Sequence, residues 1–280
     1  MKSMESSWKN GKDIDIFVQE WAPDGEVRAA IGLVHGLGEH TGRYHHVARW
    51  LTAAGYAMLG IDLPGHGRTK GPRGFTSFDE IGSEIDLLLS ELEKRYPGKP
   101  RFLYGHSMGG AAVLNHVLAR RPVLHGAIVT SPGLATGEPV PAAKIFLAKV
   151  MARLMPSFSM NNGLDLQNLS RDPAVIRAYQ QDPLVHNQIS ARLGLDFLTR
   201  GDWILARAGE FPVPLLLMQG SADHIVSTAA VSQLASLIPP GKLTYKVWEG
   251  FYHETHNEPE QEQVLQTIGN WLDQQLEMVY

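Results

Sequence analysis

Cysteine is missing from this 280-residue sequence altogether. Without thiols the chain can form no disulfide bond, no cysteine nucleophile and no thiolate metal site. Basic residues are also few and scattered, since 25 Lys and Arg stand against 29 Asp and Glu and the formal net charge is −4. Because no basic block occurs, we expect no nucleic-acid partner.

Long hydrophobic runs and cofactor signatures are absent as well. No apolar stretch reaches the length of about 20 residues that spans a bilayer, and Met1 to Trp8 lack the apolar core of a signal peptide. We therefore expect a soluble, cytoplasmic protein. The 12 histidines show no HExxH spacing, and no phosphate-binding or dinucleotide-binding glycine motif occurs. We expect neither a metal nor a cofactor.

Strand-like and helix-like segments alternate along most of the chain. Short apolar runs predict strands at 14–21, 29–34, 56–61, 101–104, 127–130, 214–219 and 243–248. Apolar residues at helical spacing predict helices at 44–54, 78–96, 111–117, 228–237 and 259–278. This alternation is typical of an α/β fold with a mostly parallel central sheet and helices on both faces.

The alternation stops between residues 134 and 207, where the sequence predicts mainly helices and loops. Such an interruption indicates a helical cap inserted over the carboxyl edge of the sheet, where open α/β sheets bind their ligands. We therefore expect an α/β core of residues 1–133 and 208–280 with a cap of residues 134–207.

A G-x-S-x-G motif at 105–109 lies between a predicted strand and a predicted helix. Strand, motif and helix in this order form the pattern of a nucleophile elbow, a sharp turn that presents a serine over the sheet edge. The glycines remove side chains where the backbone passes closely. Ser107 would then lie at a helix N-terminus, where free N–H groups favour developing negative charge. The alternative interpretation is an ordinary glycine-rich turn.

A serine nucleophile needs a base within hydrogen-bond reach and a carboxylate that orients this base. In this architecture the acid follows a late strand and the histidine comes later still. Asp223 follows one predicted strand and His253 follows the next, so both have the expected positions. An equally good interpretation makes Asp223 a surface turn residue. His224 and His256 are rival candidates for the base.

An oxyanion hole needs two N–H donors that point to the developing negative oxygen. One comes from the residue after the nucleophile, here Met108, and the other comes from the loop after an early strand. That loop begins with His-Gly-Leu-Gly at 35–38, so the Leu37 N–H is the candidate. Two parts of one mechanism thus occur in the expected order.

Together these motifs resemble those of the monoacylglycerol lipase and lysophospholipase-like family of serine α/β-hydrolases. The resemblance covers nearly the whole chain and rests on HGLGEH at 35–40, GRY at 42–44, Asp62, GHG at 65–67, GHSMGG at 105–110, YQQDPL at 179–184, QGSAD at 219–223 and EGFYH at 249–253. It implies an α/β-hydrolase fold and a serine esterase that hydrolyses a small lipid ester, a monoacylglycerol, with a triad of Ser107, Asp223 and His253.

The resemblance also implies a polar set that binds the glycerol head group, namely Glu39, Arg43, Tyr179 and His256. The alternative is that Arg43 and Glu39 pair and brace their loop while Tyr179 packs in the cap. The chain departs from the vertebrate members, which carry cysteines in the cap and acid-loop regions. The cap differs most, so the resemblance leaves the acyl-chain preference open.

An amphipathic helix is predicted from Ala142 to Met155, started by Pro141, with one broad apolar face that includes Phe146, Val150 and Met151. These three residues are candidates for the wall of an acyl-chain channel. Basic residues on the other face suit transient contact with an anionic membrane or micelle, which would make the protein peripheral. The alternative is a helix whose apolar face packs on the core.

Other functions are compatible with the same residues. A lysophospholipase or a general carboxylesterase would use the same triad on the same fold. A non-catalytic ligand receptor is a more remote alternative, because every triad and oxyanion element is present here. Turnover of a simple nitrophenyl ester separates an enzyme from a receptor.

Overall fold

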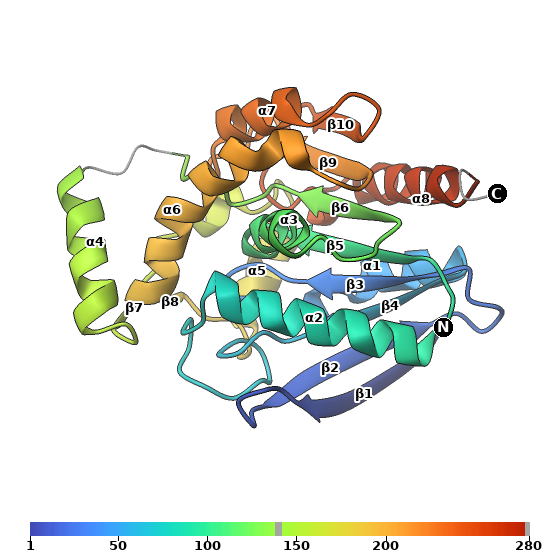
Figure 1. The fold of residues 1–280 in the computed structure, drawn as a ribbon, viewed down its shortest axis with the longest axis horizontal. Coiled ribbons are helices and arrows are strands. Elements are labelled where there is room, and N and C mark those ends of the chain that lie inside the picture. The colour runs from blue at the N-terminus through green and yellow to red at the C-terminus, as the bar shows by residue number, and fades with distance from the viewer. Residues whose placement is uncertain (138–141, 278–280) are drawn as a thin grey trace.

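The computed structural model describes residues 1–137 and 142–277, and in this part of the chain eight strands form one sheet in the order β1-β2-β4-β3-β5-β6-β9-β10 (Figure 1). The strands are β1 (Lys2–Lys9), β2 (Asp15–Ala22), β3 (Ala29–Val34), β4 (Tyr56–Ile61), β5 (Arg101–His106), β6 (Gly126–Thr130), β9 (Leu215–Gly220) and β10 (Leu243–Trp248). From β4 to β10 neighbouring strands are parallel, whereas β1 and β2 are antiparallel at one edge. The predicted fold class is confirmed.

The strands carry apolar side chains on both faces of the sheet, and helices pack over both faces to bury them. In β9, Leu215 and Leu217 share one buried cluster with α2 (Phe78–Arg95), α3 (Met108–Arg120) and α7 (Thr228–Leu237). The intervening Leu216 and Met218 belong to a second cluster, with α1 (His45–Ala53) and α8 (Gln261–Glu277). Successive side chains of a strand point to opposite faces, so each apolar strand supplies both clusters.

Most predicted boundaries agree with the structure. The strands at 29–34, 56–61 and 243–248 and the helix at 228–237 have the predicted limits. The sequence analysis missed β1, whose side chains are mostly exposed and which is held by antiparallel pairing with β2. An edge strand with no buried face has no hydrophobic pattern by which it can be recognised.

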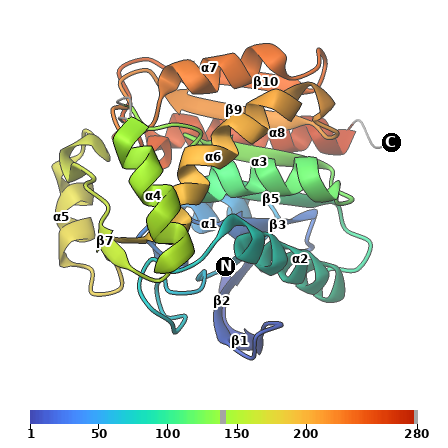
Figure 2. The same cartoon turned by 60° about the vertical axis from the view of Figure 1, so that its left-hand side comes forward.

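The predicted interruption lies between β6 and β9. It contains α4 (Ala142–Leu154), β7 (Ser159–Asn161), α5 (Pro173–Gln181), β8 (Gln188–Ser190) and α6 (Ala191–Arg207). β7 and β8 pair antiparallel, which the sequence did not predict. In Figures 1 and 2, α4 and α5 lie beyond the edge at which β3 and β6 end. The helix predicted at 142–155 matches α4 closely, while Pro141 before it and the predicted helix end at Met278 lie outside the described residues.

Short 3₁₀ turns complete the described elements: η1 (Thr41–Tyr44), η2 (Leu166–Asn168), η3 (Ala208–Glu210) and η4 (Thr255–Asn257). The loop after β10 is bonded to the inserted segment, because the Leu169 carbonyl oxygen accepts the Glu254 N–H at 2.8 Å. Every helix within residues 1–137 and 142–277 is too short or too polar to cross a membrane.

Candidate active site

Ser107 occupies the sharp turn between β5 and α3. Its backbone angles are φ 53° and ψ −116°, a strained conformation for a residue with a side chain. The motif needs glycine at 105 and 109 because nearby backbone leaves no room for a side chain. A Cβ on Gly105 would lie 2.5 Å from the Gly109 carbonyl oxygen, and one on Gly109 would lie 2.0 Å from that of Val34. The structure therefore has the geometry of the predicted elbow.

Three residues from separate loops form a continuous hydrogen-bonded chain. The Ser107 Oγ lies 2.9 Å from the His253 Nε2, and the His253 Nδ1 lies 2.8 Å from the Asp223 Oδ2. Asp223 follows β9 and His253 follows β10, so two neighbouring parallel strands bring both side chains to the same edge. The Ser131 hydroxyl donates to the His253 carbonyl oxygen at 2.7 Å and holds that loop.

The two rival histidines have other surroundings. His224 is exposed. His256 is fully buried, and its ring centroid lies 5.0 Å from that of Tyr44 and 4.8 Å from that of His106. Among the described residues, the histidine bonded to Ser107 is His253.

Asp223 and His253 shift each other's pKa in opposite directions. Burial alone would raise the pKa of Asp223, but His253 and the N–H groups of Ile225 and Val226 lower it below the ordinary value. Burial alone would lower the pKa of His253, but the charge and hydrogen bond of Asp223, together with the charges of Glu254 and Glu39, raise it above the ordinary value. The site thus pairs an ionised acid with an imidazole of increased basicity.

The oxyanion loop, residues 35–40, follows β3 and passes beside the elbow. A Cβ on Gly36 would lie 3.3 Å from the Ser107 Cβ. His35 braces this loop, because its Nε2 accepts the Leu63 N–H at 3.0 Å and its Nδ1 therefore donates to the Gly36 carbonyl oxygen at 2.8 Å. No described residue accepts the N–H of Leu37.

Met108 is the first residue of α3, so its N–H has no acceptor within the helix. It is joined covalently to Ser107, and its side chain is buried. The two N–H groups that the sequence nominated as oxyanion donors, those of Met108 and Leu37, therefore lie on the two chain segments that meet at the serine.

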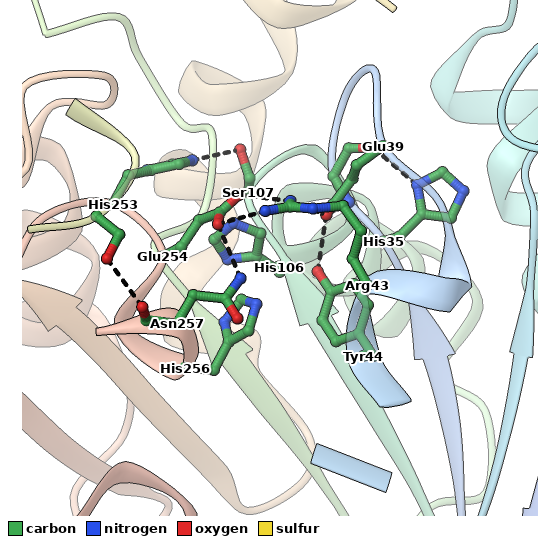
Figure 3. A network of polar contacts seen from close by, with 12 residues as sticks. His35, Glu39, Arg43, Tyr44, His106, Ser107, His253, Glu254, His256 and Asn257 are labelled. Carbon is green, nitrogen blue, oxygen red and sulfur yellow. Dashed lines mark hydrogen bonds and ion pairs between the residues drawn. The ribbon is translucent and has the colours of Figure 1, made fainter. Parts of the chain in front are cut away.

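A buried ion cluster adjoins the oxyanion loop (Figure 3). Arg43 Nη1 donates to Glu39 Oε2 and to Glu254 Oε1, each at 2.6 Å, and Arg43 Nη2 donates to Glu254 Oε2 at 2.7 Å. Glu39 Oε1 accepts the Gly36 N–H at 2.6 Å and the Tyr44 hydroxyl at 2.7 Å. Burial would raise the pKa of both carboxyl groups, but the Arg43 guanidinium lowers both. Two ionised acids therefore flank one guanidinium.

This cluster bears on the head-group expectation. Glu39 and His256 are only 2% and 0% exposed in this structure, and their contact with a substrate head group stays a prediction. The Arg43 side chain is 10% exposed, and carboxylates engage both of its terminal nitrogens. The alternative interpretation, in which Arg43 and Glu39 pair and brace the loop, agrees with these contacts.

Tyr179 lies on α5, in the inserted segment. The Arg43 guanidinium lies over its ring, 4.7 Å from the centroid. Burial raises the pKa of Tyr179, so its hydroxyl stays protonated. No described residue forms a hydrogen bond with that hydroxyl. In the expected head-group set, the Tyr179 hydroxyl and both ring nitrogens of the buried His256 therefore have no hydrogen-bond partner among the described residues.

The three predicted channel residues of α4 differ in exposure. Phe146 is 70% exposed, whereas Val150 and Met151 are half-buried. Leu147 and Leu154 are exposed as well, so the apolar face does not pack on the core as the alternative interpretation required. The helix instead packs against α6 (Figure 2).

Sequence reasoning missed Glu254, Asn257 and His106. Asn257 Nδ2 donates to Glu254 Oε2 at 2.8 Å. The His106 ring lies 4.9 Å from the ring of His253, and burial, together with His253, lowers the pKa of His106 to about 4. Their positions in the sequence could have pointed to two of them, because His106 directly precedes Ser107 and Glu254 directly follows His253.

Comparisons with known proteins show the family of this chain. The family described as serine aminopeptidase, S33 (Hydrolase_4) matches residues 25–260. The chain is 34% identical over 271 residues to a monoacylglycerol lipase of Mycolicibacterium smegmatis, with 96% of each chain covered. It is 35% identical over 265 residues to an abhydrolase domain-containing protein of Dictyostelium discoideum, of which it spans 28%.

A solved structure is similar over nearly the whole chain. The crystal structure of Paleococcus ferrophilus monoacylglycerol lipase matches with a TM-score of 0.87 and 35% identity, covering 93% of this chain and 99% of that one. Fold, motifs and relatives therefore agree. The chain belongs to the S33 family of serine α/β-hydrolases, in its monoacylglycerol lipase-like group, and is a carboxylic ester hydrolase.

Proposed function

We propose that this enzyme hydrolyses monoacylglycerols with Ser107, His253 and Asp223 as its catalytic triad. The observation that carries the proposal is the chain of hydrogen bonds from the serine Oγ through the imidazole to the carboxylate, at 2.9 and 2.8 Å. The similarity to two proteins named monoacylglycerol lipase supports the choice of substrate. The proposal includes a cap of residues 134–207 over a core of residues 1–133 and 208–280.

Acylation begins when the Ser107 Oγ attacks the ester carbonyl carbon and His253 Nε2 takes the hydroxyl proton. Asp223 holds the Nδ1–H and stabilises the imidazolium. The negative oxygen of the tetrahedral intermediate accepts the N–H groups of Leu37 and Met108, and losing one such donor typically costs about 3 kcal/mol. The intermediate then expels the glycerol oxygen, which His253 protonates, and the acyl group stays on the serine.

Deacylation repeats these steps with water. A water molecule attacks the acyl carbonyl carbon while His253 takes one of its protons. The second tetrahedral intermediate expels the Ser107 Oγ, which regains its proton from the imidazolium. The fatty acid leaves, and the triad returns to its starting state.

Substrate recognition would come from the inserted segment. The unpaired Tyr179 hydroxyl, next to the oxyanion loop, would donate to a glycerol hydroxyl. Val150 and Met151, half-buried on α4, would line the acyl chain. The exposed Phe146 would touch the membrane or micelle that holds the substrate.

Initial rates on a matched panel test the proposal. The panel holds monoacylglycerols of short to long acyl chain, lysophosphatidylcholine, a diacylglycerol and nitrophenyl butyrate, with Ser107→Ala as the inactive control. We expect monoacylglycerols to be preferred. A preference for lysophosphatidylcholine would identify a lysophospholipase, and turnover confined to nitrophenyl butyrate would identify a general carboxylesterase. Turnover retained by Ser107→Ala would remove the serine from its role.

A further inference from the structure

Two loops that are far apart in the sequence carry the proposed machinery. The oxyanion loop supplies the Leu37 N–H, and the base loop, residues 249–257, carries His253. The spacing of these loops decides whether the base and the oxyanion donor face the same carbonyl group. A misplacement of roughly 1 Å can lower a reaction rate about 100-fold.

A continuous chain of charged contacts joins the two loops (Figure 3). In the base loop, Glu254 follows His253 directly, and both of its carboxylate oxygens accept hydrogen bonds from Arg43. Arg43 also donates to Glu39 in the oxyanion loop at 2.6 Å. Glu39 in turn accepts the N–H of Gly36, the residue before the proposed donor, at 2.6 Å. Each end of the chain is thus one residue away from a proposed catalytic group.

The three charged side chains are largely shielded from water and bonded to one another. Both carboxylates are buried. Each accepts one further hydrogen bond from a neutral side chain, the Tyr44 hydroxyl on Glu39 and the Asn257 amide on Glu254. Removing one partner of a buried ion pair is strongly destabilising because an uncompensated charge remains, whereas exposed pairs contribute little. These contacts therefore resist displacement of one loop relative to the other.

We propose that Glu254 is a positioning residue: together with Arg43 and Glu39 it fixes the base loop against the oxyanion loop. The inference rests on the proposed function, because it takes His253 as the base and Leu37 as the oxyanion donor. Glu254 touches neither the substrate nor the reacting atoms. Its removal should therefore slow the chemical steps without weakening substrate binding.

Glu254→Gln is the first test, because glutamine keeps the size of the side chain but cannot accept both hydrogen bonds from Arg43. We expect kcat to fall at least about 10-fold, with KM unchanged within about 2-fold. The loss should be equal on a monoacylglycerol and on a nitrophenyl ester of the same acyl chain, since the two differ only in their leaving group. A head-group site would instead affect the monoacylglycerol alone.

Glu20→Gln is the matched control. Glu20 is a buried carboxylate on β2 that accepts hydrogen bonds from Arg95 and from the Tyr96 hydroxyl, remote from both loops. The substitution weakens a comparable buried ion pair and leaves the contacts among Glu254, Arg43 and Glu39 intact. We expect Glu20→Gln to lower thermal stability while kcat stays within about 2-fold of the wild-type value.

Two further variants keep the inference falsifiable. Glu254→Asp retains the charge but is too short for the paired contact, so it should show the same kcat loss if Glu254→Gln does not fold. The double variant Glu254→Gln/Glu39→Gln should be little slower than the slower single variant, because each substitution alone already interrupts the same chain of contacts through Arg43. Losses that multiply would indicate two independent effects and overturn the inference.

The inference is also overturned if folded Glu254→Gln keeps kcat within about 2-fold of the wild-type value, or if its defect is a higher KM on monoacylglycerols only. Failure of the proposed substrate is distinguishable from these outcomes. A wild-type enzyme that turns over only the nitrophenyl ester would refute the monoacylglycerol proposal, while the positioning role is still decided by kcat on that ester.

Discussion

The backbone N–H of His186 donates to the Gly38 carbonyl oxygen at 2.9 Å. Gly38 has φ +77°, and a Cβ added to it would lie only 2.2 Å from the His186 carbonyl oxygen, so a side chain does not fit here. His186 belongs to the inserted segment between α5 and β8, and Gly38 follows Leu37 directly. The inserted segment is therefore seated on the loop that is proposed to supply an oxyanion donor.

Gly38→Ala should damage catalysis because the new methyl group displaces the His186 backbone and the oxyanion loop together. We expect kcat to fall at least about 10-fold. Gly98→Ala is the control, since Gly98 has a similar φ of +71° with open space at its Cβ position. It should lose about 1–2 kcal/mol of stability from backbone strain and keep its activity. Equal kcat values for the two variants would contradict this prediction.

Asp223→Asn should lower kcat by about four orders of magnitude, because the amide no longer orients the imidazole in the tautomer that accepts the Ser107 proton. His224→Ala, at the exposed neighbouring residue, should keep nearly full activity. Steady-state rates on a nitrophenyl ester measure both effects. A severe loss in the His224 variant with a mild one in the Asp223 variant would require a different acid and base.

The pH dependence of kcat/KM should report His253. The imidazole must be neutral to take the serine proton. Burial lowers its pKa, but the charge and hydrogen bond of Asp223, with the charges of Glu254 and Glu39, together raise it above the ordinary histidine value of 6.5. Activity should therefore be lost as the pH falls through a midpoint above 6.5. A profile measured on a soluble ester gives this midpoint, and a value below 6.5 would refute the prediction.

Tyr179→Phe should raise KM for monoacylglycerols several-fold and leave nitrophenyl butyrate unaffected, because it removes a hydroxyl without disturbing the ring that packs on Arg43. The loss of one neutral hydrogen bond is worth about 1 kcal/mol. Parallel KM measurements on the two esters provide the check. Equal effects on both substrates would remove Tyr179 from head-group recognition.

Phe146→Ser should slow hydrolysis of emulsified long-chain monoacylglycerols but not of dissolved nitrophenyl butyrate. The phenyl ring is 70% exposed on α4 and would lose its apolar contact with the lipid surface. Val123→Ser, at a 77% exposed apolar residue between α3 and β6, is the matched control and should change neither rate. Equal rates for Phe146→Ser and the wild type on the emulsion would exclude interfacial contact at this position.

Local sequence patterns predicted the fold and the elbow well, for a physical reason. Strands buried on both faces need continuous apolar runs, as in β4 and β3, and these runs mark their own limits. The turn at Ser107 excludes side chains from Gly105 and Gly109 through contacts with nearby backbone, so its motif is visible in the chain itself. β1 escaped detection because backbone pairing alone defines it.

Tertiary structure decided which partners the polar residues have. The resemblance implied a head-group role for Glu39, Arg43 and His256, but only folding brings Glu254 from more than 200 positions away onto Arg43 and buries Glu39 and His256. Burial and charge pairing depend on what several distant segments place around a side chain, and no local pattern encodes them. Sequence alone thus determined the chemistry that this protein carries, and the packed structure decided which residues remain free to meet a substrate.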